Sequence, residues 1–339
     1  HLLTMAQKQD KSTTLPGVFA TLSAGFELTT RYLWLMVIPA LLDLFLWVGP
    51  RLSFRPLLES VFAQLPVEAM LIDPGPLLSE ALPRLNHFTY LAVPLLGVPA
   101  LMTGLAPERT PIQPAVIERL GWGEWFGYLL LFTVAGLLLA AVFYSLIAYA
   151  LRRAGAPPGE APGLALGRLA QRVMRTWLRL LGLAAVLVVL ILVILVPVTL
   201  LAGFVALINQ ALASVVLIGA LVVILWLALF FGYAPQGMTL NPRPFLSSLG
   251  DSIRLFQKNL PASLGVLFVV LLARQLLSNI LLSADSGTWV TVINILAHAY
   301  ISTALVVALF IFYRDRYLAF LQGVASRGAG PQTSTEHVK

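Results

Sequence analysis

Six long runs of almost uninterrupted apolar residues divide this chain, and each is 18 or more residues long. The hydrocarbon core of a bilayer is about 30 Å thick and requires roughly 20 apolar residues in a helix that crosses it. Because backbone groups cannot form hydrogen bonds with lipid, each run is predicted to be helical. The runs are Arg31–Val48, Trp125–Leu151, Leu180–Leu207, Ala211–Tyr233, Ala262–Leu282 and Trp289–Tyr313. The pattern predicts an all-α, polytopic membrane protein with six transmembrane helices.

The composition supports one membrane domain over residues 1–339. The chain is 59% hydrophobic and 11% charged, whereas soluble domains are about 25% charged. It contains no cysteine, which excludes disulfides, thiolate nucleophiles and cysteine-ligated metals. The formal net charge of +7 does not indicate a nucleic-acid partner, because the basic residues lie at the edges of the apolar runs.

Those basic residues predict the orientation. Lys and Arg occur in residues 1–31, 152–179, 234–261 and 314–339, whereas the short connections 208–210 and 283–288 contain none. In residues 49–124, acidic residues outnumber basic ones. The positive-inside rule therefore predicts that both termini are cytoplasmic, in a bacterial cytoplasmic (inner) membrane, and that residues 49–124 form an outer, proline-rich cap.

One part of this cap is apolar enough to enter the membrane. Residues 88–105 carry no charge, but they include Pro94, Gly97 and Pro99. Prolines and a glycine disfavour one smooth helix. We expect a re-entrant or interfacial segment, and a seventh span is the alternative.

A similar segment precedes three of the runs, within residues 1–30, 152–179 and 234–261. Each reads as an amphipathic helix in the plane of the cytoplasmic interface, ending in a basic residue. In each, a leucine precedes the basic residue by nine positions. The pairs are Leu22 and Arg31, Leu166 and Arg175, and Leu249 and Lys258. These three segments fit a threefold internal repeat, and they also fit coincidental patterning at membrane edges.

Six spans, the segment Pro244–Leu260 and the closing Phe312–Arg316 resemble a diffuse group of bacterial membrane proteins. That group includes the membrane domain attached to some glycerophosphodiester phosphodiesterases. The resemblance implies a layout of spans and in-plane helices. It implies no hydrolysis, because the phosphodiesterase catalytic domain is absent here, and it carries over no site residues.

Ionisable residues inside spans are costly and are therefore candidate functional residues. Asp43 and Arg274 are both predicted in the outer halves of their spans, either as an ion pair or separately solvated. On the last two spans, polar residues recur four positions apart, so they are predicted to form hydrogen bonds across a tight hairpin. The predicted polar cluster consists of Asp43, Arg274, Gln275, Asn279, Asn294 and His298. Its alternatives are helix–helix contacts and a transport site. A metal or haem site is disfavoured, because no second ligand accompanies His298.

A basic face before the third run indicates a lipid partner. It comprises Arg168, Arg172, Arg175 and Arg179. Such a face is predicted to bind anionic lipid headgroups on the cytoplasmic side. The sequence leaves protein partners and a homo-oligomer open.

Enzyme motifs are missing: there is no G-x-S-x-G, H-E-x-x-H or Walker A sequence. We therefore predict no catalytic residues, no metal and no cofactor. The leading hypothesis is a non-enzymatic integral membrane protein that organises or stabilises a membrane assembly or its lipid environment. The alternative is a transporter or channel for a lipid-like or small solute that uses the polar cluster.

Overall fold

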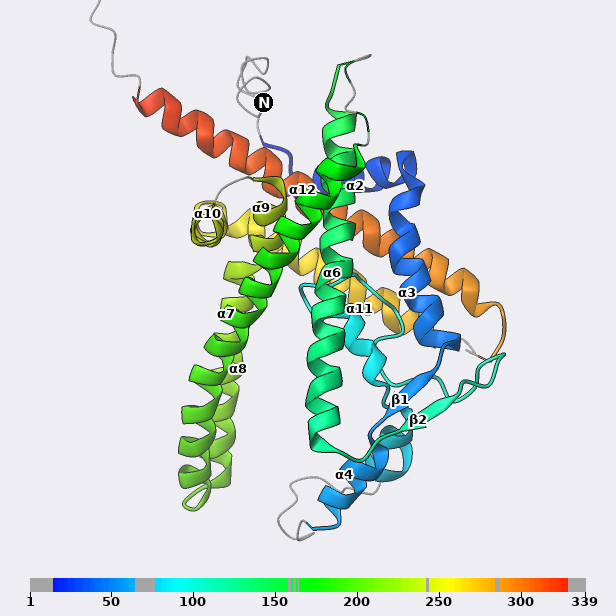
Figure 1. Cartoon of the computed structure of the whole chain (residues 1–339). Helices are drawn as coiled ribbons and strands as arrows, with labels where there is room; N and C mark the ends of the chain where they lie inside the picture. The colour runs from blue at the N-terminus through cyan, green and yellow to red at the C-terminus, as the bar shows by residue number, and fades with distance from the viewer. Residues whose placement is uncertain are drawn as a thin grey trace, which may run out of the picture.

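The computed structural model describes residues 15–64, 77–157, 160, 163, 165–241, 244–283 and 287–328, and helices dominate it (Figure 1). Among these residues, five helices are long and apolar enough to cross a membrane, and a bent helix pair provides up to one more. The five are α6 (Trp122–Ala154), α7 (Leu166–Ala206), α8 (Gln210–Phe231) extended by α9 (Ala234–Leu240), α11 (Leu260–Leu282) and α12 (Thr291–Gly328). The prediction of an all-α, multi-pass membrane protein is confirmed at this level.

Helix α12 forms the centre of the bundle. In its most apolar stretch 78% of the residues are buried, against 6% in α7 and in α8. Its most extensive neighbour is α2 (Val18–Arg31). The two helices touch at Gly25, whose missing Cβ would lie 2.5 Å from the carbonyl oxygen of Ala304. Helices α7 and α8 instead form an apolar hairpin that diverges from α6 (Figure 1).

A sharp bend separates the first predicted amphipathic segment from the first predicted span. Helix α2 lies at 95° to the segment formed by η1 (Leu33–Met36) and α3 (Val37–Val48), because the backbone leaves the helical region at Tyr32. The apolar segment therefore begins at Leu33 rather than at Arg31.

The last of the three repeated segments has the same form as the first. Helix α10 (Phe245–Lys258) has 14 residues, as α2 has, and ends in a basic residue. The backbone leaves the helical region at Asn259, and α11 follows with a proline in its first turn. Proline suits the first turn of a helix because its missing N–H has no partner to lose there.

The middle segment differs from the prediction. Residues 152–154 end α6, and residues 166–179 are the first part of α7, which continues without a break to Ala206. No proline occurs between Leu166 and Val196, so nothing interrupts the ladder of helical hydrogen bonds near the basic residues. The in-plane helix predicted within 152–179 is therefore part of one long helix.

The outer connection contains structure that the apolar pattern does not predict. Strands β1 (Arg51–Ser53) and β2 (Val116–Glu118) pair in parallel, with Leu52 opposite Ile117. Asn86 strengthens this pairing by accepting a hydrogen bond from the Leu52 N–H at 3.2 Å. The other elements are α4 (Arg55–Phe62), η3 (Leu77–Ala81), η4 (Leu82–Arg84) and η5 (His87–Ala92).

Residues 88–105 contain no helix long enough to span a bilayer. After η5 the chain is irregular, with positive φ at Val93 (29°) and Leu95 (66°). It packs closely on α6, because a Cβ on Gly136 would lie 2.4 Å from the carbonyl oxygen of Leu91. Val98 and Leu101 are buried. Irregular backbone at membrane depth must have its hydrogen bonds satisfied by protein, so this segment requires acceptors within the bundle.

His87 makes the outer connection sensitive to acid. Its ring packs on Phe54 and Trp125, with centroids 4.4 and 5.6 Å away, and burial lowers its pKa from 6.5 to about 4. Between these values the unfolded chain binds the proton more readily than the folded chain does. Stability is therefore complete above pH 6.5 and is expected to fall as the pH drops towards 4. Unfolding followed by tryptophan fluorescence between pH 7 and 4 measures this, and His87→Phe should weaken the dependence. An unchanged pH dependence in His87→Phe would contradict the assignment.

Candidate functional site

Two buried ionisable side chains meet between α3, α12 and the outer segment. Asp43 and His298 are 0% and 1% exposed, and the Asp43 Oδ2 lies 3.4 Å from the His298 Nδ1. The other carboxylate oxygen, Oδ1, accepts hydrogen bonds from the backbone N–H groups of Leu101 at 2.6 Å and Met102 at 2.9 Å. Asp43 is thus the acceptor that the irregular outer segment requires.

This arrangement connects three separate parts of the chain. A buried carboxylate without partners would be costly, and backbone N–H groups are good donors to its charge. The Oδ2–Nδ1 contact has the distance of an ion pair but lacks hydrogen-bond geometry. The geometry therefore assigns Asp43 first to holding the outer segment inside the bundle.

The predicted ion pair between Asp43 and Arg274 does not form. Helix α3 packs on α12, η1 and η5, so its buried carboxylate faces His298 rather than α11. Arg274 lies near Tyr144 of α6. Of the two alternatives that the sequence left open, the ion pair is not formed, because positions along two spans do not specify which faces of the spans meet.

The other predicted polar residues are distributed over three places. Gln275 donates to the Asn279 Oδ1 at 3.0 Å, but both residues lie on an exposed face of α11. Asn294 donates across the hairpin to the Leu281 carbonyl at 3.1 Å. His298 faces inward to Asp43. The structure therefore brings the six residues together only as two pairs and not as one cluster.

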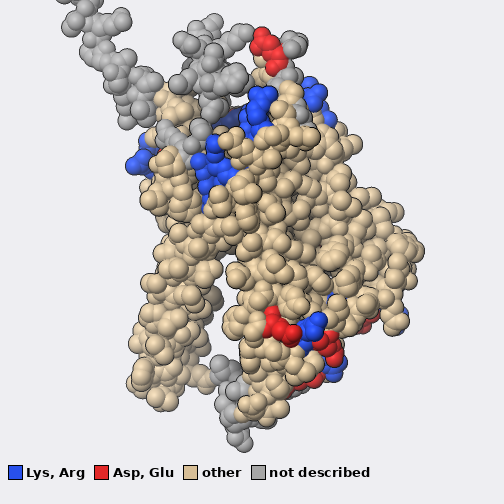
Figure 2. Space-filling model, viewed as in Figure 1, with Lys and Arg blue, Asp and Glu red and all other residues tan. Residues whose placement is uncertain are grey.

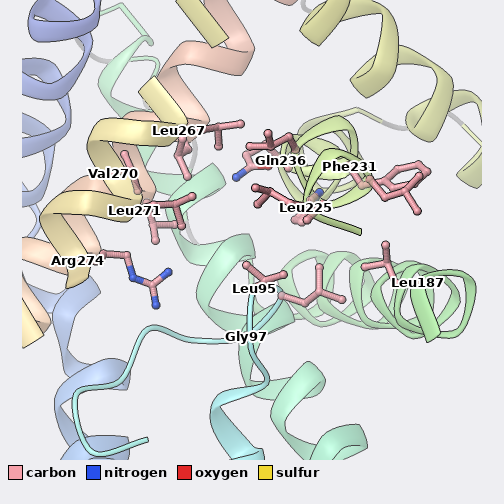
Figure 3. Close-up of a pocket in the computed structure, with 18 of the residues that line it drawn as sticks. Leu95, Gly97, Leu187, Leu225, Phe231, Gln236, Leu267, Val270, Leu271 and Arg274 are labelled. Carbon is pink, nitrogen blue, oxygen red and sulfur yellow. The ribbon is translucent and has the colours of Figure 1, made fainter. Parts of the chain in front are cut away.

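A cavity of about 250 Å³ lies between the α7–α8 hairpin, α6, α9, α11, α12 and the outer segment (Figure 3). Ten of the 23 described residues that line it are leucines, from the outer segment, α7, α8, α11 and α12. Residues that line it include Leu95, Gly97, Leu187, Leu225, Phe231, Leu267, Val270 and Leu271.

Among the described residues, three long polar side chains line this cavity. The Tyr144 hydroxyl lies 3.1 Å from the carbonyl oxygens of Leu96 and Gly97, to which it donates. When the Gln236 amide is oriented so that its nitrogen faces acceptors, this nitrogen donates to two carbonyl oxygens just before Gln236 in the chain, at 3.2 and 3.1 Å. Arg274 makes no hydrogen bond or ion pair with any side chain or backbone group in the described part of the chain. Its guanidinium extends towards Leu95 and Gly97 (Figure 3).

The four predicted headgroup-binding arginines have two different environments. Arg168, Arg172 and Arg175 are exposed on the first turns of α7. Arg179 instead donates to the carbonyl oxygens of Met238 and Asn241, at 2.8 and 3.0 Å. These carbonyl groups lie at the C-terminal end of α9, where no N–H group of the helix is available to bond to them. Arg179 therefore stabilises a helix terminus, and three arginines remain on the surface.

Comparison with known family models, with curated proteins and with solved structures finds no match for this chain. The layout resemblance to the membrane domain of some glycerophosphodiester phosphodiesterases therefore stays a prediction.

Sequence reasoning missed the backbone donors of the Asp43 site and the walls of the cavity. Leu101 and Met102 contribute main-chain groups, which leave no signal in residue type. The cavity depends on where the α7–α8 hairpin diverges from α11, which no local pattern encodes. Tyr144 had one available signal, because it is a polar aromatic residue inside an apolar run.

Proposed function

We propose that this protein is a non-enzymatic integral membrane protein that binds an amphiphile, with an apolar chain and an anionic group, in the cavity beside Arg274. In doing so it would organise the lipid around the bundle. One observation carries the proposal: the Arg274 guanidinium, which makes no hydrogen bond or ion pair with the described residues, lies in the wall of a mainly apolar cavity.

The physical argument has two parts. Apolar walls with a few polar groups are typical of small-molecule sites, and 250 Å³ lies just below the roughly 300–1,000 Å³ of such sites. The volume suits one chain segment rather than a whole lipid. A charged side chain near the middle of a bilayer costs about 2.5–3.5 kcal/mol, and an anionic partner reduces this cost because arginine forms paired hydrogen bonds with carboxylate and phosphate groups.

For the membrane arrangement, we propose six spans with both termini in the cytoplasm of a bacterial cell, the protein residing in the cytoplasmic membrane. Lys and Arg outnumber the acidic groups visible at the end of the molecule where α10 and the second half of α12 lie, whereas red and blue groups mix at the opposite end (Figure 2). The positive-inside rule assigns the basic end to the cytoplasm. Reporter fusions at both termini and within residues 77–120 test this orientation.

Arg274→Leu is expected to weaken amphiphile binding about tenfold or more, since a hydrogen bond to a charged group is worth about 1.5–3 kcal/mol. Native mass spectrometry of the full chain, with dioleoyl-phosphatidylglycerol, oleate or dioleoyl-phosphatidylcholine added, measures the affinities. The matched control is Gln275→Leu, on the exposed side of the same helix, which should bind as the wild type does. Arg274→Lys should be intermediate. Equal binding by Arg274→Leu and wild type would reject the proposal.

A second candidate function is transport of the same amphiphile. The observation in its favour is the irregular backbone of Leu95–Gly97 in the cavity wall, because interrupted backbone often lines transport sites. Flux of a fluorescent fatty acid in proteoliposomes separates the two functions. Binding without flux excludes transport and leaves the binding role in place.

A further inference from the structure

A second cavity, of about 110 Å³, lies where α6, α9 and α12 meet at the basic end of the bundle. Arg152 and Gly155 line it from the end of α6, and Asn241 lines it from the end of α9. Tyr313, Arg314 and Tyr317 form the wall on α12. These residues are separate from those of the cavity beside Arg274 and from the Asp43 site.

The charges around this cavity are not balanced. The Nη2 of Arg152 is buried and makes no hydrogen bond with the described residues. Arg172 on α7 is close enough to repel Arg152 electrostatically. Arg314 has one counter-ion, Asp315, with its Nη2 2.9 Å from the Asp315 Oδ1. Two arginines thus line the cavity and a third lies near Arg152, whereas no carboxylate is among the described residues of the lining.

The wall of the cavity on α12 is supported by contacts within the protein. The rings of Tyr313 and Tyr317 are stacked, with centroids 5.5 Å apart and an angle of 12° between them. Asn241 donates to the Tyr313 hydroxyl at 3.0 Å, which joins α9 to α12. A site built from fixed aromatic and amide groups does not need to reorganise when a ligand binds.

A purely structural role explains only part of this arrangement. Arg152 lies in the last turn of α6, where a cation is favourable to the helix dipole. That accounts for its position along the helix. It does not account for a buried guanidinium nitrogen without an acceptor, or for a second arginine held close to the first, because both cost free energy in the absence of an anion.

We propose that this cavity binds a phosphate group of net negative charge, presented either by the headgroup of an anionic phospholipid or by inorganic phosphate. Phosphate oxygens accept paired hydrogen bonds from guanidinium groups and would satisfy the Arg152 Nη2. A volume of 110 Å³ is several times the roughly 30 Å³ that one water molecule occupies in the liquid, so the cavity has room for such a group.

The test uses the purified full chain in detergent. Inorganic phosphate is titrated at constant ionic strength, with thermal unfolding as the readout. In parallel, native mass spectrometry measures binding of dioleoyl-phosphatidic acid, dioleoyl-phosphatidylglycerol and dioleoyl-phosphatidylcholine. The variants are Arg152→Gln and Arg314→Gln. The matched control is Arg153→Gln, because Arg153 is exposed, does not line the cavity and donates to the Tyr149 hydroxyl at 3.3 Å.

We expect Arg152→Gln to weaken binding about tenfold or more and Arg314→Gln to weaken it less, since Asp315 already occupies Arg314. Arg153→Gln should bind as the wild type does. Saturation by inorganic phosphate would identify free phosphate as a ligand, and binding of the two anionic lipids alone would identify a headgroup. The proposal is overturned if no phosphate compound binds. It is also overturned if Arg152→Gln folds and binds as tightly as the control. If Arg152→Gln does not fold, Arg314→Gln takes its place in this comparison.

Discussion

Replacing Asp43 with alanine is expected to lower the free energy of unfolding by about 3–5 kcal/mol, the usual cost of removing one partner from a buried charged pair. The change leaves the N–H groups of Leu101 and Met102 without their acceptor and His298 without its partner. The irregular outer segment then has no means of satisfying two donors inside the bundle. The outer segment should therefore detach before the helices separate.

Unfolding in mixed micelles measures the total loss, and limited proteolysis of the outer segment reports its detachment. Asp43→Asn should cost less than Asp43→Ala, because the amide oxygen still accepts a hydrogen bond. The matched control is Asp315→Ala, whose carboxylate is 22% exposed and pairs with Arg314; it should cost about 1 kcal/mol or less. Similar losses for Asp43→Ala and Asp315→Ala would show that Asp43 does not hold the segment.

Gly25→Ala is expected to destabilise the protein by about 3 kcal/mol, at the upper end of the range for overpacking. The added Cβ would lie 2.5 Å from the Ala304 carbonyl oxygen and 2.8 Å from the Ala308 Cβ. Backbone atoms of the central helix cannot move aside as the end of a flexible side chain can. Helix α2 must therefore separate from α12 along their most extensive contact.

Gly250→Ala provides the control, because Gly250 lies within α10 and a Cβ there would have no atom within 4 Å. This substitution should stabilise the protein by about 0.5–1 kcal/mol through helix propensity alone. Both variants add one methyl group to a helical glycine, so unfolding midpoints compare them directly. Equal effects would mean that α2 is not held closely against α12.

Asp43, in the first predicted span, and Arg274, in the fifth, have opposite environments. Asp43 has three polar partners within the protein, whereas Arg274 has no hydrogen bond or ion pair among the described residues and lines a cavity. Losing Asp43 should therefore reduce stability. Losing Arg274 should reduce binding and leave stability nearly unchanged, which separates structural from ligand-binding roles at membrane depth.

Several elements were predictable from local pattern. The apolar runs predicted α8, α11 and most of α6, because a helix that faces lipid needs only length and hydrophobicity. The break before α11 has a local cause in Asn259 and the proline that follows. A turn after the first amphipathic segment was also expected, and α2 is followed by a bend of 95°. By contrast, the continuation of α7 through its basic end was not predicted. A basic, leucine-rich segment is compatible with lying in the interface or with continuing a span.

The apolar runs alone are enough to identify this chain as a multi-pass helical membrane protein, because the bilayer imposes the same length and polarity on every spanning helix. Which polar residues meet depends on the packing of the bundle. Asp43 pairs with His298 and with backbone N–H groups of a distant segment, and Arg274 is left facing a cavity. The physical reason is that partners inside a bundle depend on how helices rotate and cross, and these are settled by packing contacts such as that of Gly25 on α12.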